Sequence, residues 1–471
     1  MIRNREFYDA VASLTLKCLP LIDPAIKAAF LPHKIEKYPN LEFGDSGFPK
    51  ISEYPSRVDV SHFFEAPYPG KEPDIDLSKM EEYDHAFTIA VSTKEIKTYF
   101  IYKDADSVDI KKFVDFLIRG LIKDFIERYY YLHGAQFDAF KFEDIYKPFE
   151  TFFYSDNLHF DISIPILFTK FDTEYFELTP NIAIRKISDD VHRARHSIVG
   201  YSPAIVDSVF MSATHELVLH HYSYERPKHV FTSVFSQPSL YPRQHIEKFL
   251  SVLKIETDIT SGYAQFLVHP KGWVADYKHD IKSMHGASVR SYPSWFDDYF
   301  WNKKDYPRVT EEQLKNISKS FATVLESTDN KLNFAIKRFY RSTMRDEEED
   351  IILDLIIALE TLLGDSGKTE MTQKLAYRIG GLLGNHSTSF CDANEVFENV
   401  KKIYAYRSSI IHGSVKTNNK REIKLPENKS IAIVDLARDY LREVLKIVIH
   451  NPKYLDVKEV DRLILGNNTG K

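Results

Sequence analysis

The spacing of apolar residues divides the chain into a strand-patterned stretch followed by a helix-patterned one. Between residues 150 and 305, segments such as 159–171 and 177–187 alternate apolar and polar positions, which is typical of strands in a sheet. From Thr310 onward the apolar positions recur at steps of three and four residues, as in 346–365. Thr310 itself, followed by Glu-Glu-Gln, predicts a helix N-cap. The pattern therefore predicts a strand-rich region and then an all-helical domain of about five helices.

The first third of the chain has a more mixed pattern. A short helix is predicted over 7–19, two strands over 85–104, and a long helix over 109–131 that ends at His133-Gly134. Within the strand-rich region, 245–255 has helical spacing. We predict an α+β fold with three regions: a mixed α/β region at 1–148, a strand-rich region at 149–308 and a helical bundle at 309–471.

Composition narrows the classes of protein without naming a function. The chain has 471 residues, of which 43% are hydrophobic and 28% charged, and its net charge of -6 argues against a surface coated with basic residues for non-specific nucleic-acid binding. Two distant cysteines, Cys18 and Cys391, give no disulfide framework, which favours a reducing, cytoplasmic compartment. No apolar stretch of about 18 residues predicts a membrane span, and the charged N-terminus does not resemble a signal peptide.

Two charged residues fall on the predicted inward face of the helical domain. The apolar stripe that begins at Val396 reaches Arg407, and Glu360 lies at the edge of the stripe formed by Ile356 and Leu363. An unpaired buried charge is costly, so Arg407 and Glu360 are expected to meet. Spacing alone leaves a structural ion pair and a functional site as equal alternatives.

His412 favours the functional alternative. It lies five residues after Arg407, which places it about 140° around the helix axis, and Gly413 is a natural helix terminator. Imidazole exchanges protons near neutral pH, and guanidinium offers a planar fork of donors to a phosphate. His412 and Arg407 together could cleave an RNA strand: the imidazole would move protons at the ribose 2′-OH or the leaving 5′-oxygen, and the guanidinium would bind the scissile phosphate.

Three helical segments in order resemble the Apea-like branch of the HEPN superfamily. They are ALETLLGD at 358–365, KLAYRIGGLLG at 374–384 and IYAYRSSIIHG at 403–413, and the resemblance covers about 310–460. Arg407 and His412 match the RxxxxH catalytic signature of that family. Ser408 occupies its polar position, where Asn, Asp or His is commoner, and Glu360 matches the acid that holds the arginine.

The resemblance implies a bundle of four to five helices and a metal-independent endoribonuclease with no cofactor, in an anti-phage or toxin-type system. Implied partners are RNA, with tRNA foremost, a second copy of the chain, and a phage-derived trigger; Arg378 and Tyr406 are further candidates for RNA contact. Products would carry a 2′,3′-cyclic phosphate and a 5′-OH. The alternative is a catalytically inactive HEPN module that dimerises and senses a nucleotide or a phage protein.

Other segments imitate functional motifs. Arg128 and His133 repeat the spacing of the Arg-His pair, but a histidine at a helix end favours interaction with the helix dipole. The segment 215–220, HELVLH, has its histidines one residue too far apart for the zinc motif HExxH and is strand-patterned. The HRARH segment at 192–196 is interpreted as a solvated loop, with a contact to an RNA backbone or a docking site for a partner as the alternative. No P-loop, dinucleotide or nucleophile-elbow motif occurs.

Overall fold

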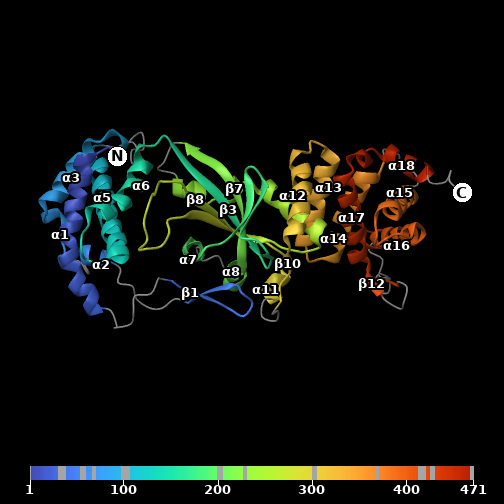
Figure 1. Cartoon of the computed structure of the whole chain (residues 1–471), viewed down its shortest axis with the longest axis horizontal. Coiled ribbons are helices and arrows are strands. Elements are labelled where there is room, and N and C mark those ends of the chain that lie inside the picture. The colour runs from blue at the N-terminus through green and yellow to red at the C-terminus, as the bar shows by residue number, and fades with distance from the viewer. Residues whose placement is uncertain are drawn as a thin grey trace.

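A computed structural model shows three regions in a row along the long axis of the molecule: N-terminal helices, a central sheet and C-terminal helices (Figure 1). The structure describes residues 2–29, 39–52, 60–65, 70–96, 107–198, 205–225, 231–299, 305–365, 371–411, 421–424 and 430–466. The fold is thus mixed α/β with a helical C-terminal region, as the sequence pattern predicts.

The N-terminal region is mainly helical. Its elements are α1 (Arg5–Ala29), the hairpin of β1 (Asn40–Phe43) and β2 (Pro49–Ser52), α2 (Ser61–Phe64), η1 (Leu77–Lys79), α3 (Glu81–Ser92), α5 (Ser107–His133) and α6 (Ala139–Tyr154). Interlocked rings of α5 and α6, including Phe125, Phe142 and Phe149, fill its core.

The prediction of strands at 85–104 is wrong where the structure describes the segment, since 85–92 belongs to α3. Buried Tyr83, Ala86 and Ala90 recur at steps of three and four residues and face the core shared with α1 and α5. The β-branched residues between them imitate a strand pattern locally, but tertiary packing decides the conformation.

A six-stranded antiparallel sheet in the order β5-β6-β7-β3-β8-β9 forms the centre of the molecule. Its strands are β3 (Asn157–Leu167), β5 (Tyr175–Thr179), β6 (Ile182–Lys186), β7 (Ala213–Glu225), β8 (Tyr263–Pro270) and β9 (His285–Ser291). The alternation at 159–171 and 177–187 is therefore confirmed, and so is the helix at 245–255, which is part of α10 (Arg243–Thr257). A short parallel pair joins β4 (Lys170–Phe171) to β10 (Arg308–Val309).

The two faces of the sheet belong to separate hydrophobic cores. Ile162 and Ile164 of β3 share one core with Phe249 of α10, whereas Leu167 shares the other with α7 (Asp189–Ile198) and α8 (Asp207–Met211). The remaining short helices near the sheet are α9 (Phe231–Phe235), η3 (Pro238–Leu240) and α11 (Trp295–Tyr299). Successive residues of a strand point to opposite faces of the sheet, which explains why Ile164 and Leu167 of β3 belong to different cores.

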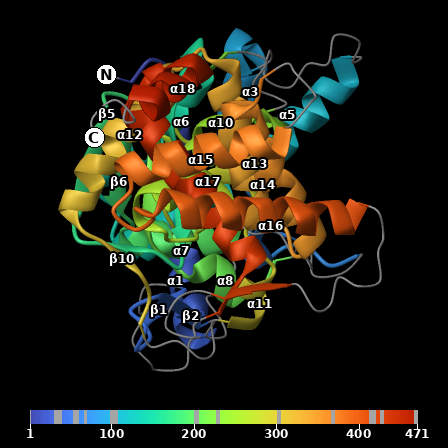
Figure 2. The same cartoon turned by 90° about the vertical axis from the view of Figure 1, so that its right-hand side faces the viewer.

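The C-terminal region contains seven α-helices among its described residues, where the sequence pattern predicts about five. They are α12 (Glu311–Glu326), α13 (Asn330–Met344), α14 (Glu348–Leu363), α15 (Met371–His386), α16 (Ala393–Ile411), α17 (Ile433–His450) and α18 (Val457–Gly466), together with η6 (Pro452–Leu455) and the hairpin of β11 (Glu422–Lys424) and β12 (Ser430–Ala432). The predicted N-cap at Thr310 is confirmed as a full capping box with Gln313. Figure 2 shows α15 and α16 side by side across the end of the molecule.

Candidate functional site at the end of α16

Helix α16 is placed by its apolar stripe. Val396, Val400 and Ile403 are buried, as predicted, and the helix packs against α14, α15 and α17. Gly380 permits the close approach of α15, because a side chain there would meet the backbone oxygen of Ala393 at 2.7 Å. This packing fixes the direction in which the last turns of α16 project.

Arg407 lies half-buried on the flank of this stripe, near the C-terminal end of α16. Its Nε is enclosed, and among the described residues it has no hydrogen-bond partner. Buried donors are nearly always paired, and among the described arginines only Arg338 and Arg442 share this state of the Nε. An oxyanion that enters from outside the described chain would supply the missing acceptor.

Glu360 lies beside the same position but does not form the direct ion pair with Arg407 that the sequence predicts. Its Oε1 accepts a hydrogen bond of 3.1 Å from the hydroxyl of Tyr404, which lies one turn before Arg407. Burial raises the pKa of Tyr404, the charge of Glu360 raises it further, and the charge of Arg407 opposes this shift. Tyr404 is therefore the common neighbour of the two charges and occupies the place of the predicted contact.

Tyr404 is the residue of this cluster that the sequence interpretation missed. A signal exists: it lies on the buried stripe of α16, and a buried tyrosine hydroxyl usually requires a polar partner. Glu360, on the neighbouring helix α14, is the acid that accepts this hydrogen bond.

The other predicted site residues differ in how they are placed. Ser408 is exposed beside Arg407. Tyr406 is buried and donates to Glu348 Oε2 at 3.2 Å, so its ring does not face solvent where RNA could stack on it. His412 lies outside the described residues, directly after Ile411, which ends α16 and is 51% exposed.

Arg378 is a structural clamp and gives no support to the prediction of RNA contact. Its Nε and Nη2 bind the two carboxylate oxygens of Asp461 at 2.8 and 2.9 Å, and its Nη1 donates to the carbonyl oxygen of Leu363 at 2.7 Å. The guanidinium is 8% exposed and also pairs with Asp365. It therefore ties α14, α15 and α18 together.

The segments in the first 300 residues that resemble functional motifs form structural contacts instead. Arg128 donates to the carbonyl oxygens of His279 and Ile281, and His133 ends α5, with Gly134 at a left-handed φ of 76°.

The HELVLH segment is part of strand β7, as its alternation predicts. His215 and Glu216 are neighbours on a strand and point to opposite faces, so the geometry of a helical zinc motif does not form. Glu216 instead accepts from Arg185 at 2.6 Å and from Ser163 at 2.7 Å inside the sheet.

The interpretation of HRARH as a solvated loop is wrong. These residues form a turn of α7, and Arg195 is fully buried, with bonds to the carbonyl oxygens of Phe210 and Met211 and to Gln265 Oε1. Burial without a carboxylate partner lowers the pKa of Arg195 to about 9. The segment fastens α7 to the sheet, and this leaves Arg195 unable to contact RNA.

Comparison of the chain with known protein families, curated proteins and solved structures finds no match. Within the described residues, none of the helices has the length and apolar character required to cross a bilayer. The assignment of a function therefore depends on the residues at the end of α16.

Proposed function

We propose that the C-terminal helical region is a HEPN-type, metal-independent endoribonuclease whose site comprises Arg407 and His412. The observation that supports this most is the enclosed Nε of Arg407, which has no acceptor among the described residues although it lies beside the Tyr404–Glu360 pair. Arg338 and Arg442 also have an enclosed Nε without a described acceptor, but both form ion pairs through their other guanidinium nitrogens, with Asp354 for Arg338 and Asp258 for Arg442, whereas no ion pair joins Arg407 to a described carboxylate.

The proposed reaction needs one proton acceptor, one proton donor and a cation. The imidazole of His412 accepts the proton of a ribose 2′-OH, the 2′-oxygen attacks phosphorus, and the bond from phosphorus to the 5′-oxygen breaks as that oxygen gains a proton from a water molecule. Arg407 binds the phosphate and the charge that develops on it. The products are a 2′,3′-cyclic phosphate and a 5′-OH. An RNA loop, as in tRNA, suits this step because its ribose can reach an in-line geometry.

Glu360 and Tyr404 would act as positioning residues. The carboxylate holds the tyrosine hydroxyl, and the tyrosine lies against the arginine, so the guanidinium has a fixed surface on its protein side. We further propose that two copies of the chain associate through this region in the cytoplasm and that a phage-derived trigger activates the site.

The test is cleavage of total tRNA by the purified full-length protein in EDTA, with the new ends mapped. Arg407→Ala and His412→Ala are expected to abolish cleavage while circular dichroism and the unfolding midpoint stay unchanged. Arg462→Ala, which removes an arginine of α18 that is 73% exposed, is the matched control and should cleave normally. Equal cleavage by His412→Ala would refute the proposal. Binding without cleavage in the unmutated protein would instead support the sensor alternative.

A further inference from the structure

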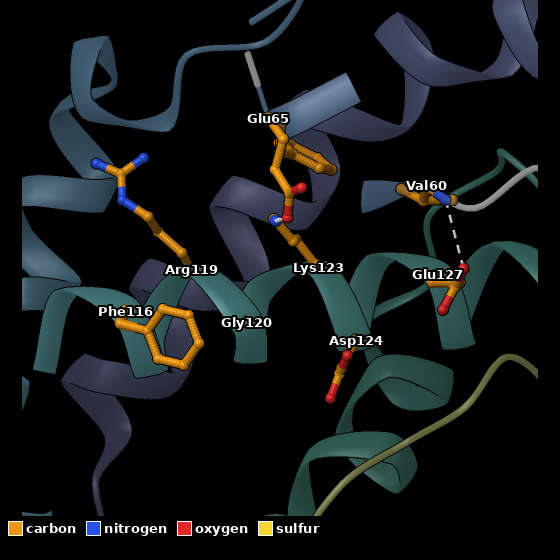
Figure 3. Close-up of a pocket in the computed structure, with 9 residues that line it drawn as sticks. Val60, Glu65, Phe116, Arg119, Gly120, Lys123, Asp124 and Glu127 are labelled. Carbon is orange, nitrogen blue, oxygen red and sulfur yellow. Dashed lines mark hydrogen bonds and ion pairs between the residues drawn. The ribbon is translucent and has the colours of Figure 1, made fainter. Parts of the chain in front are cut away.

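A cavity of about 410 Å³ lies between α2 and α5 in the N-terminal region (Figure 3). Its size is in the range of small-molecule sites. Apolar walls come from Val60 and Phe64, and one face of α5 supplies most of the remaining lining. The cavity is at the opposite end of the molecule from α16, so it is separate from the proposed RNA site (Figure 1).

Gly120 leaves one side of this cavity open. It lies in the middle of the 27-residue helix α5, where glycine destabilises a helix relative to alanine. A Cβ at this position would meet no described atom within 4 Å, so packing within the described chain does not require a glycine. The missing side chain does, however, let a flat ligand approach the helix backbone at the cavity floor.

Phe116 lies one turn before Gly120 and is 79% exposed. A phenylalanine ring at the edge of a cavity, with most of its surface in water, gains from a second ring that covers it. Figure 3 shows Phe116 and Arg119 at the same end of the cavity, with the ring and the guanidinium pointing to different sides of α5.

Arg119 presents a fixed guanidinium at the same end. Its Nε binds Asp115 Oδ2 at 2.9 Å, and its guanidinium carbon lies 4.9 Å from the centre of the Tyr83 ring. The Tyr83 hydroxyl binds the other oxygen of Asp115 at 2.5 Å, which holds the carboxylate in place. The Nη1 and Nη2 edge has no acceptor among the described residues, so it can bind an oxyanion as a fork.

Lys123 provides a second cation one turn further along α5. Its partner is Glu65, at 2.5 Å, and the glutamate side chain is 63% exposed. The Lys123 side chain is 15% exposed, so an incoming oxyanion would have to displace the exposed Glu65 carboxylate from a half-buried ion pair. Figure 3 shows Lys123 and Glu65 meeting above the helix next to Gly120.

The other acids of the lining oppose an anion less than their number suggests. Burial raises the pKa of Asp124 to about 7, so this carboxyl is partly neutral at physiological pH. Glu127 is occupied by the backbone N–H of Val60 at 3.4 Å and by His279 Nδ1 at 2.8 Å. Arg119 is paired with Asp115 and Lys123 with Glu65, so a phosphate would bind Arg119 through its Nη1 and Nη2 edge and would reach Lys123 by displacing Glu65.

We propose that this cavity binds a nucleoside monophosphate, with its base over Gly120 against Phe116 and its phosphate between Arg119 and Lys123. The base would lie over the open backbone at Gly120 and stack on the exposed ring of Phe116. The phosphate would bind the guanidinium of Arg119 and the ammonium of Lys123. This site is independent of RNA cleavage and gives the N-terminal region a ligand of its own.

The test measures AMP binding to the full-length protein by calorimetry and by the shift of the thermal unfolding midpoint. AMP is expected to raise the midpoint, whereas adenosine alone and inorganic phosphate alone at the same concentration are not. Gly120→Ala should keep or raise the midpoint of the free protein, because alanine favours the helix, and yet weaken AMP binding at least about ten-fold by filling the floor.

Three further variants separate the parts of the site. Phe116→Ala should weaken binding about ten-fold through lost stacking, Arg119→Lys should weaken it comparably through the lost fork, and Glu65→Gln should strengthen it by removing the competing carboxylate. Lys111→Gln, an exposed lysine of the same helix, is the control and should bind normally. No midpoint shift with AMP, or the same affinity in Gly120→Ala, would overturn the proposal. Because none of these measurements requires cleavage, they do not depend on whether the RNA site is active.

Discussion

The buried histidine of the central sheet should make the protein lose stability in mild acid. His269 Nε2 lies 2.6 Å from Ser163 Oγ, and that hydroxyl donates its proton to Glu216 Oε2 at 2.7 Å. A serine has a single proton to give, so Nε2 must carry the donor proton and Nδ1 must be bare. Nδ1 is buried without a partner among the described residues. A second proton on His269 would therefore enter a site with no acceptor.

The magnitude follows from the pKa of His269. Burial lowers this pKa from its ordinary value of 6.5 to about 4, against a smaller opposing effect of Glu216. As the pH falls, the unfolded chain binds the proton first, so the free energy of unfolding decreases between about pH 6.5 and pH 4. The full loss is about 3.4 kcal/mol, and about 2 kcal/mol of it is reached by pH 5.

The assay compares urea unfolding at pH 7.5 and pH 5.0 for the unmutated protein and for His269→Gln. The glutamine amide can replace the Nε2 donor to Ser163 but cannot be protonated in this range. Tryptophan fluorescence follows the transition, because Trp273 is buried against β3 and donates to the His159 carbonyl oxygen. His192 is also buried and has a lowered pKa, but it is present in both proteins and cancels from the difference.

The unmutated protein should lose about 2 kcal/mol more than His269→Gln between the two pH values. His85→Gln, which replaces an exposed histidine of α3, is the control and should leave the loss unchanged. If the unmutated protein and His269→Gln lose equal amounts, the argument from Nδ1 is wrong.

Further predictions concern the helical region. Arg378→Met should lower the free energy of unfolding by about 2 kcal/mol, less than for a fully buried pair because Asp461 is 44% exposed, as measured by urea unfolding. Thr310→Ala should cost about 1 kcal/mol by removing the N-cap, again measured by unfolding. Tyr404→Phe should slow tRNA cleavage several-fold with the fold intact, since Glu360 loses its partner; an unchanged rate would argue against a positioning role.

Patterns that act over a few residues were predicted well from the sequence. The stripe of α16, the N-cap at Thr310 and the strand β3 each depend on periodicity or on contacts within one turn. The position of Arg407 beside the buried stripe of α16 also follows from the helical spacing of the sequence. These features follow from local geometry, so the sequence contains the information needed to predict them.

Features that depend on distant partners were not predicted. The HRARH segment has the composition of a solvated loop, yet Arg195 is buried because Gln265, 70 residues further along, and two carbonyl oxygens of α8, 15 and 16 residues further along, satisfy its donors. Likewise the segment at 85–92 is helical because Ala86 and Ala90 meet a core made by α1 and α5. A local sequence pattern does not indicate which residues from distant parts of the chain will pack against a segment.

The contrast between Arg378 and Arg407 shows why this matters for function. Both are arginines on adjacent helices of one bundle, and the sequence interpretation treated both as candidates for contact with RNA. The structure separates them because Asp461, 83 residues further along, saturates one side of Arg378, whereas the enclosed Nε of Arg407 has no described acceptor. An arginine whose donors are satisfied within the chain stabilises the fold, and one whose donor is left over is free to bind an anion. Hydrogen-bond satisfaction, which only the three-dimensional arrangement reveals, therefore separates Arg407 from Arg378 as the candidate for the phosphate in the proposed reaction, although Arg338 and Arg442 also have an enclosed Nε without a described acceptor.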